Sequence, residues 1–146
     1  MRRSIDDGVR TYLAEDSGDY ARRDRQAVER ALAELGVEAD TDFAQFYLRY
    51  QGPFIGRRST PDLDELVGFG SSIMSTLDYF NERCELGRHF IPLVSDESEG
   101  TFLYDTRTGR VYDFNLAEYE QFKNGRVQPR WASFGEFLDW FFAVSE

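Results

Sequence analysis

The sequence predicts an α+β fold, in which helices precede an antiparallel run of strands and a further helix closes the chain. Three observations lead to this prediction: apolar stripes at helical spacing in the first half, two alternating segments around a turn at residues 106–109, and a capped aromatic helix near the end. We expect a sheet of about five or six strands flanked by helices. The 146 residues, without linker or repeat, fit one domain spanning residues 1–146, and polar residues 1–15 are expected to fray.

Two helices are expected before the sheet. Residues 20–35 end at Gly36, and their apolar stripe consists of Val28, Ala31, Leu32 and Leu35. Thr41 or Asp42 can cap the next helix, which stops at Gly52 and Pro53. Its aromatic stripe consists of Phe43, Phe46, Tyr47 and Tyr50. Four aromatic rings could form a ligand cage, but core packing is favoured because each ring removes roughly 150–250 Å² from water.

A third helix and two strands are predicted in the middle of the chain. Residues 65–69 read as a short strand, and a helix capped at Ser75 is expected to run to Gly87. Residues 90–94 form an apolar strand that contains Pro92. Because proline donates no hydrogen bond to a ladder, this strand is expected at a sheet edge or at a bulge.

A β-hairpin is the clearest pattern in the chain. Residues 101–105 alternate, with Phe102 and Tyr104 on one face and Leu103 on the other. The turn 106–109 ends in Gly109, and residues 110–115 form the returning strand. Residues 116–130 are polar and irregular, with a further short strand expected near residues 126–130.

A capping box, from Ser133 to Glu136, predicts the start of the last helix. Apolar residues cover a broad part of this helix surface, and they are Phe134, Phe137, Leu138, Trp140, Phe141, Phe142 and Val144. A helix wedged against the sheet is favoured, and an exposed aromatic patch used for binding is the alternative.

Composition excludes several classes of protein. The net charge is −10, and residues 36–146 alone carry 19 acidic against ten basic residues, so a nucleic-acid backbone would meet repulsion. The surplus fits either simple solubility or a surface complementary to a basic partner. No apolar stretch is long enough to span a membrane, and one cysteine allows no internal disulfide. We expect a soluble, cytoplasmic protein that contacts neither nucleic acid nor membrane.

Catalytic and metal-binding patterns are missing from the sequence. The motifs of nucleophilic hydrolases, P-loop proteins and zinc proteases do not occur. The single histidine, His89, has too few thiol or imidazole companions for a zinc site. Cys84 falls on an apolar helix face, which favours an inert buried thiol. We therefore expect no enzyme activity, no metal and no cofactor.

Acidic residues are the only candidates for a site. One group, beside and within the predicted hairpin, consists of Asp96, Glu97, Glu99 and Asp105. A second, on a predicted loop and the strand after it, consists of Asp62, Asp64 and Glu65. Both groups could be solvated loops, partner-binding patches or, less readily, a Ca²⁺ or Mg²⁺ site, but the spacing lacks the EF-hand pattern. We expect both groups to bind a partner protein.

The order of these elements resembles the SUKH superfamily, the Smi/Knr-type domain. The matching segments cover roughly residues 40–142 and are FAQFYLRYQG, STLDYFNERCEL, FIPLVSDESEG, FLYDTRTGRVYDF and ASFGEFLDWF. Two departures concern the acidic loop, where Gly100 is the glycine that remains, and the entry to the second helix, which reads Ala39-Asp40-Thr41.

The resemblance implies a function that the residues alone do not. Many bacterial members are immunity proteins, each of which neutralises a cognate secreted toxin, often a nuclease. Eukaryotic members act as regulatory binding modules, and no catalytic residues come with the family. The resemblance thus predicts an immunity protein, monomeric or a weak homodimer, that covers the active surface of a basic toxin. A non-catalytic regulatory or scaffold module of the same family is the alternative.

Overall fold

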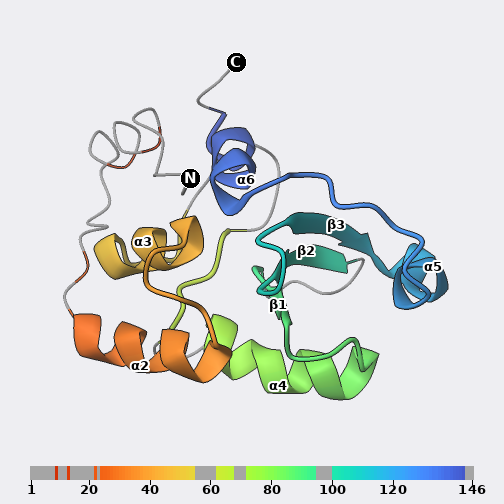
Figure 1. Cartoon of the computed structure of the whole chain (residues 1–146), viewed down its shortest axis with the longest axis horizontal. Helices are drawn as coiled ribbons and strands as arrows, with labels where there is room; N and C mark the ends of the chain where they lie inside the picture. Colours follow the sequence, from red (N-terminus) through yellow and green to blue (C-terminus); the bar gives the residue numbers. More distant parts are fainter. Residues whose placement is uncertain are drawn as a thin grey trace.

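The computed structural model describes Val9, Leu13, Arg22, residues 24–54, 62–67, 72–94 and 100–143. Its helices before the sheet are α2 (Arg25–Leu35), α3 (Asp42–Arg49) and α4 (Ile73–Cys84). The strands are β1 (Phe90–Pro92), β2 (Gly100–Asp105) and β3 (Val111–Asn115). The 3₁₀ helix η1 (Leu116–Glu118) and the helices α5 (Tyr119–Lys123) and α6 (Phe134–Phe141) follow. Figure 1 shows this order, and it confirms the α+β class.

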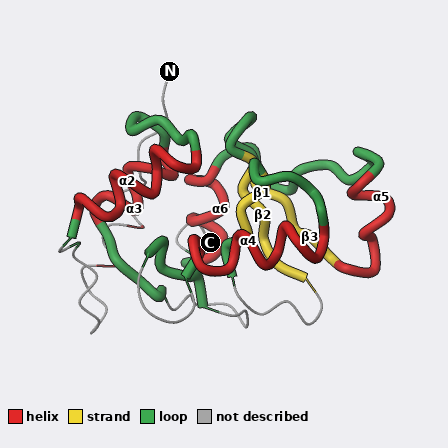
Figure 2. The backbone as a smooth tube through the Cα atoms, turned by 90° about the horizontal axis from the view of Figure 1, so that it is seen from below, coloured by secondary structure: helices red, strands yellow, loops and turns green. Residues whose placement is uncertain are grey.

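The sheet is antiparallel, with the strand order β1-β2-β3. Leu103 in the central strand lies opposite Pro92 on one side and Tyr112 on the other. Pro92 therefore lies on an edge strand, as its missing N–H predicted. Figure 2 shows the strands between α2 and α3 at one end of the molecule and α5 at the other.

The predicted count of five or six strands is not confirmed, because the described residues form three. The segment expected as a strand at residues 65–69 instead accepts hydrogen bonds from the start of the next helix. The carbonyl oxygens of Glu65 and Leu66 accept the first N–H groups of α4, from Ile73 (2.8 Å) and Met74 (3.0 Å). Residues 68 and 69 lie outside the described residues. The strand expected at residues 126–130 is reduced to an isolated bridge between Val111 and Trp131.

Several helix boundaries differ from the prediction. Helix α2 begins at Arg25, capped by Asp24, rather than at Tyr20, and Tyr20 itself lies outside the described residues. Helix α4 is capped by Ser72, and the predicted cap Ser75 is its reciprocal partner three residues on. The same helix ends before Glu85, which takes the left-handed conformation, rather than at Gly87. Helix α5 was not predicted, because a five-residue helix is too short to show a period.

The alternation along the hairpin separates two cores. Phe102, Tyr104 and Val111 face the larger core, which lies under α3 and α6. Leu103 and Phe114 face the smaller core, which is covered by α4 and α5. These faces agree with the predicted alternation.

Aromatic packing fills the larger core. Phe43 stacks on Tyr104 with ring centroids 4.4 Å apart and meets Phe134 edge-on at 5.0 Å. Phe43, Phe46 and Tyr47 are fully buried, so the stripe predicted as core is core. Burying each such ring contributes roughly 1.5–3 kcal/mol.

Helix α6 is wedged against the sheet, as expected. Phe134, Phe137 and Phe141 are fully buried. The Asp42 carboxylate ties the start of α6 to the start of α3, because its oxygens accept the N–H groups of Gly135 (2.9 Å) and Phe43 (2.8 Å). This carboxylate thus joins two parts of the chain that are 93 residues apart in sequence.

The N-terminal segment also reaches this core. Val9 and Leu13 are buried within it, although residues 1–15 were predicted to fray. Apolar residues in a polar segment can dock on a core, which composition alone does not reveal. The other residues of the range 1–15 lie outside the described residues.

Candidate partner-binding surface

The structure describes one residue of the first predicted acidic group, Asp105. Asp96, Glu97 and Glu99 lie outside the described residues. In the sequence they fall between Val94 and Gly100. Asp105 lies at the opposite end of β2, opposite Phe90. A six-residue strand separates its ends by about 17 Å, so Asp105 lies far from Gly100, at the other end of β2.

Asp105 has a structural task at the hairpin turn. It is buried, and its Oδ1 accepts the N–H of Arg107 at 2.9 Å. Its backbone carbonyl accepts the N–H of Gly109, which has a positive φ of 78°. The carboxylate therefore stabilises the turn. Its predicted role at a partner surface stays a prediction.

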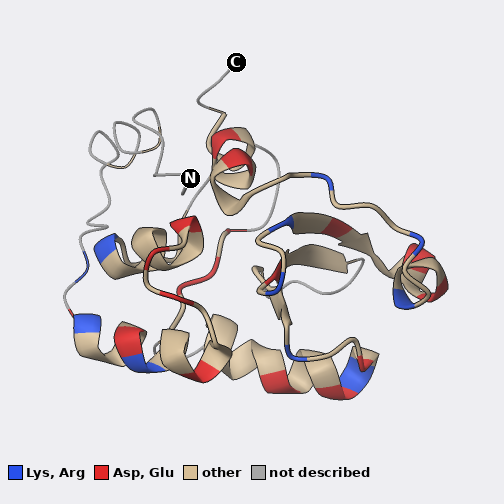
Figure 3. Cartoon of the chain, in the orientation of Figure 1, with Lys and Arg blue, Asp and Glu red and all other residues tan. Residues whose placement is uncertain are grey.

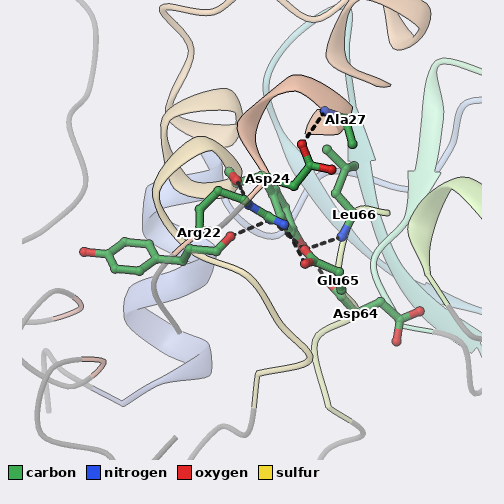
Figure 4. Close-up of polar contacts among 8 residues, drawn as sticks. Arg22, Asp24, Ala27, Asp64, Glu65 and Leu66 are labelled. Atoms are coloured by element: carbon green, nitrogen blue, oxygen red, sulfur yellow. Dashed lines mark hydrogen bonds and ion pairs between the residues drawn. The ribbon is translucent and has the colours of Figure 1, made fainter. Parts of the chain in front are cut away.

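The second acidic group divides between solvent and interior. Asp62 is exposed and Asp64 is buried. Glu65 forms an ion pair with Arg22, whose Nη1 and Nη2 each approach a carboxylate oxygen to 2.7 Å. Figure 4 shows the Arg22 guanidinium directed at Glu65, with the Asp64 carboxylate turned away from that pair.

The Arg22–Glu65 pair joins three segments of the chain. Arg22 also donates to the carbonyl oxygens of Tyr47 (2.9 Å) and Tyr50 (2.6 Å) at the end of α3. The exposed fractions of the Arg22 and Glu65 side chains are 4% and 14%. Because both side chains are largely removed from water, each charge is compensated mainly by the other. This bidentate pair is therefore a structural contact.

Tyr47 lies beside this pair. Its hydroxyl donates to the carbonyl oxygen of Asp64 at 2.9 Å. Burial, followed by the nearby charges of Glu65 and Asp64, raises the pKa of Tyr47 well above its usual value, and Arg22 opposes that rise. The phenol stays neutral and acts as a hydrogen-bond donor.

Acidic residues on the described surface are dispersed rather than gathered. Figure 3 shows them on the 62–67 segment, on α4 and α5, and on α6. Two of the exposed acidic side chains have ion-pair partners, because Arg88 pairs with Asp78 and Arg130 with Asp113. This distribution favours general attraction of a basic partner over a single acidic patch.

A small apolar groove lies along α4, and we call it the α4 groove. It is bounded by α4 on one side and by the ends of β1, β2 and β3 on the other. Its lining includes Tyr79, Phe80, Arg83, Val94, Phe114 and Leu116. Val94 and Gly100, between which the predicted acidic segment runs, both line it.

Tyr79 and Arg83 form the outer rim of the α4 groove. The Tyr79 side chain is 52% exposed. Among the described residues, no other large hydrophobic side chain is classed as exposed. Arg83 lies over its ring, with Cζ 5.8 Å from the centroid. The sequence carries a signal for this pair, an aromatic residue off the apolar stripe with an arginine four positions further on, which acidic residues alone do not reveal.

Cys84 and His89 have the surroundings of structural residues. Cys84 is buried, as predicted, and forms part of the groove floor. The His89 ring lies against Gly87, where an added Cβ would approach it to 2.8 Å, and burial lowers its pKa. Over residues 24–54, 62–67, 72–94 and 100–143, no group of three potential metal ligands comes together. In the same part of the chain, no helix could cross a bilayer.

The sheet is packed between two sets of helices, and a groove lies between α4 and the strand ends. These features define a small α+β domain with a potential binding surface. The model of the SMI1 / KNR4 family (SUKH-1) matches residues 24–140. Since the match covers most of the sequence, the chain belongs to this family, and the resemblance is confirmed. No curated protein and no solved structure matches the chain.

Proposed function

We propose that this protein is an immunity protein that binds a cognate secreted toxin and covers its active surface without catalysis of its own. The observation that carries the proposal is membership of the SMI1 / KNR4 family (SUKH-1), in which that role is common. The net charge of −10 supports a basic partner, such as a nuclease, because long-range attraction speeds association.

The proposed mode of action is steric. A rim of charged side chains guides the partner, and aromatic and arginine side chains at the centre of the contact supply most of the affinity. Tyr79 and Arg83 have the chemistry of such central contacts. The acidic residues predicted from the sequence, Asp62, Asp96, Glu97 and Glu99, are the candidates for the surrounding charged contacts. We expect a one-to-one complex that weakens as salt concentration rises.

Co-expression tests the proposal. The toxin domain encoded beside this gene is expressed in a test bacterium, with and without this protein, and growth and co-purification are followed. Restored growth together with a stable complex is the expected result. An unrelated toxin serves as the specificity control, since a general effect on expression would restore growth in both cases.

The opposite result has a definite meaning. If neither growth nor a complex is obtained with the neighbouring toxin, the immunity proposal is wrong. The family match would then favour the alternative, a regulatory module that binds a protein of the same cell. Affinity purification with the full chain would identify that partner.

A further inference from the structure

We propose that the α4 groove receives an apolar side chain of the partner protein, with a neighbouring carboxylate of the partner held by Arg83. This inference deepens the proposed function and rests on it, because it assumes that the partner is a protein. It assigns a contact surface and a local chemistry that the family match does not contain.

The groove floor is apolar. Phe80 on α4, Pro92 on β1 and Phe114 on β3 contribute to it, with Val94 and Leu116 at the strand ends. Phe80 and Phe114 meet edge-on, with ring centroids 6.0 Å apart. Both rings are buried, so binding of an apolar occupant would order few further side chains of the protein.

The rim adds residue types that dominate protein–protein contacts. Tyrosine and arginine are enriched among the side chains whose removal costs the most binding energy. Tyr79 exposes half of its surface, which is unusual for a ring in a chain whose other described large aromatic and aliphatic side chains are at least partly covered. The cation–π contact with Arg83 favours one position of the ring, so less entropy is lost when a partner docks.

Charge selects the second part of the occupant. The arginines Arg22, Arg88 and Arg130 each have a carboxylate partner. Arg83, on the part of the surface that the structure describes, makes a cation–π contact with Tyr79 and no ion pair. Other charged residues of α4, Asp78 and Glu82, are exposed, and Asp78 is already paired with Arg88. A carboxylate of the partner complements Arg83 best, because the guanidinium can donate two parallel hydrogen bonds to its oxygens.

A protein segment suits the groove better than a small ligand. Small-molecule sites enclose most of their ligand and place several polar groups around it. Here the lining is apolar with one cation at the rim, which matches a single anchor side chain and its neighbour. The acidic charge of the chain as a whole attracts a basic protein, and Arg83 then selects the register of the contact.

Peptide selection tests the inference without the toxin. The full protein is immobilised and used to select from a displayed library of random 12-residue peptides, and the enriched peptides are measured by titration. We expect an aromatic residue or leucine within two positions of an Asp or Glu. Arg83→Ala and Tyr79→Ala should each weaken binding at least tenfold, and the exposed control Glu82→Gln less than twofold.

A charge exchange makes the test specific for Arg83. Replacing the acid of an enriched peptide with Lys should abolish binding to the wild type and restore it, in part, to Arg83→Glu. Thermal unfolding of each variant confirms that α4 is intact. Peptides without an acid, unchanged affinity in the Arg83 and Tyr79 variants, or no enrichment at all would each overturn the inference.

The inference and the proposed function fail in different ways. If growth rescue by the groove variants equals that by the wild type, the groove inference is wrong and the immunity function stands. If acidic, apolar peptides select the groove but the wild type rescues no growth, the surface is confirmed and the toxin assignment is wrong.

Discussion

The two faces of the sheet differ in how their cores are built. The larger core collects Val9 and residues of α2, α3 and α6, which are far apart in sequence. The smaller core is assembled from α4, the hairpin and α5, which follow one another along the chain. The larger core is closed by buried polar contacts at Asp42 and Glu65, and the smaller one opens into the α4 groove.

This difference suggests a division of labour. Long-range packing of fully buried rings stabilises the fold, so the larger-core face has little freedom to adapt to a partner. The smaller-core face carries an exposed tyrosine and fewer buried rings, and residues there can change with less loss of stability. The following four experiments test that contrast, in order of decreasing effect.

The largest effect is expected from a cavity in the larger core. Phe134→Ala should lower the free energy of unfolding by about 4 kcal/mol, because the ring contacts several fully buried aromatics. Phe122→Ala, in the smaller core, should cost less than about 3 kcal/mol, because the five-residue helix α5 can settle into the space. Urea unfolding measures both, and equal losses would contradict the division of labour.

The buried ion pair should come next. Glu65→Gln leaves the Arg22 guanidinium buried without its counter-charge, so we expect a loss of about 3 kcal/mol in unfolding free energy. The double variant Arg22→Met with Glu65→Leu removes both charges and should recover much of this loss. A single variant as stable as the wild type would show that the pair does not secure the larger core.

The link between α3 and α6 should have a moderate effect. Asp42→Asn keeps one acceptor oxygen but not two, so one of the N–H groups of Phe43 and Gly135 loses its partner. We expect a loss of about 1–2 kcal/mol. Hydrogen exchange of the Gly135 amide, compared with that of Phe80 in α4, measures whether the loss is local to α6. Faster exchange at both positions would contradict a local role.

The smallest effect is expected at His89, near the smaller core. Burial, with the charge of Arg107, lowers the pKa of His89 below its usual value of 6.5 in the folded state. As pH falls, His89 therefore takes up its proton in the unfolded chain before it does so in the folded protein. The contribution of neutral His89 to the free energy of unfolding is fully present above pH 6.5 and declines as pH falls toward the folded-state pKa. Comparing wild type with His89→Gln at pH 7.5 and 5.5 isolates this contribution. A difference that is independent of pH would contradict the assignment.

The sequence predicted the parts of the fold that rest on periodicity. The faces of Phe102, Leu103 and Tyr104 follow from alternation, and the core role of Phe43 follows from helical spacing. The prediction of a strand at residues 65–69 was wrong for residues 65–67, the part that the structure describes. There, the Glu65 and Leu66 carbonyl oxygens accept hydrogen bonds from α4. Such tertiary partners leave no trace in local composition.

The candidate site was harder to predict for a related reason. An acidic residue looks the same in sequence whether it caps a turn, as Asp105 does, pairs with a buried arginine, as Glu65 does, or faces solvent, as Asp62 does. The α4 groove depends on strand ends and a helix that meet only in the folded chain. Exposure, which separates these cases, is a property of the fold.

Hydrogen–deuterium exchange on the complex with the neighbouring toxin domain tests the central claim most directly. The account predicts slower exchange in peptides that cover residues 76–84 and 100–101, at the α4 groove, with α3 and α6 unchanged. Protection confined to α3 and α6, with α4 exchanging as in the free protein, would contradict it and would move the binding surface to the larger-core face.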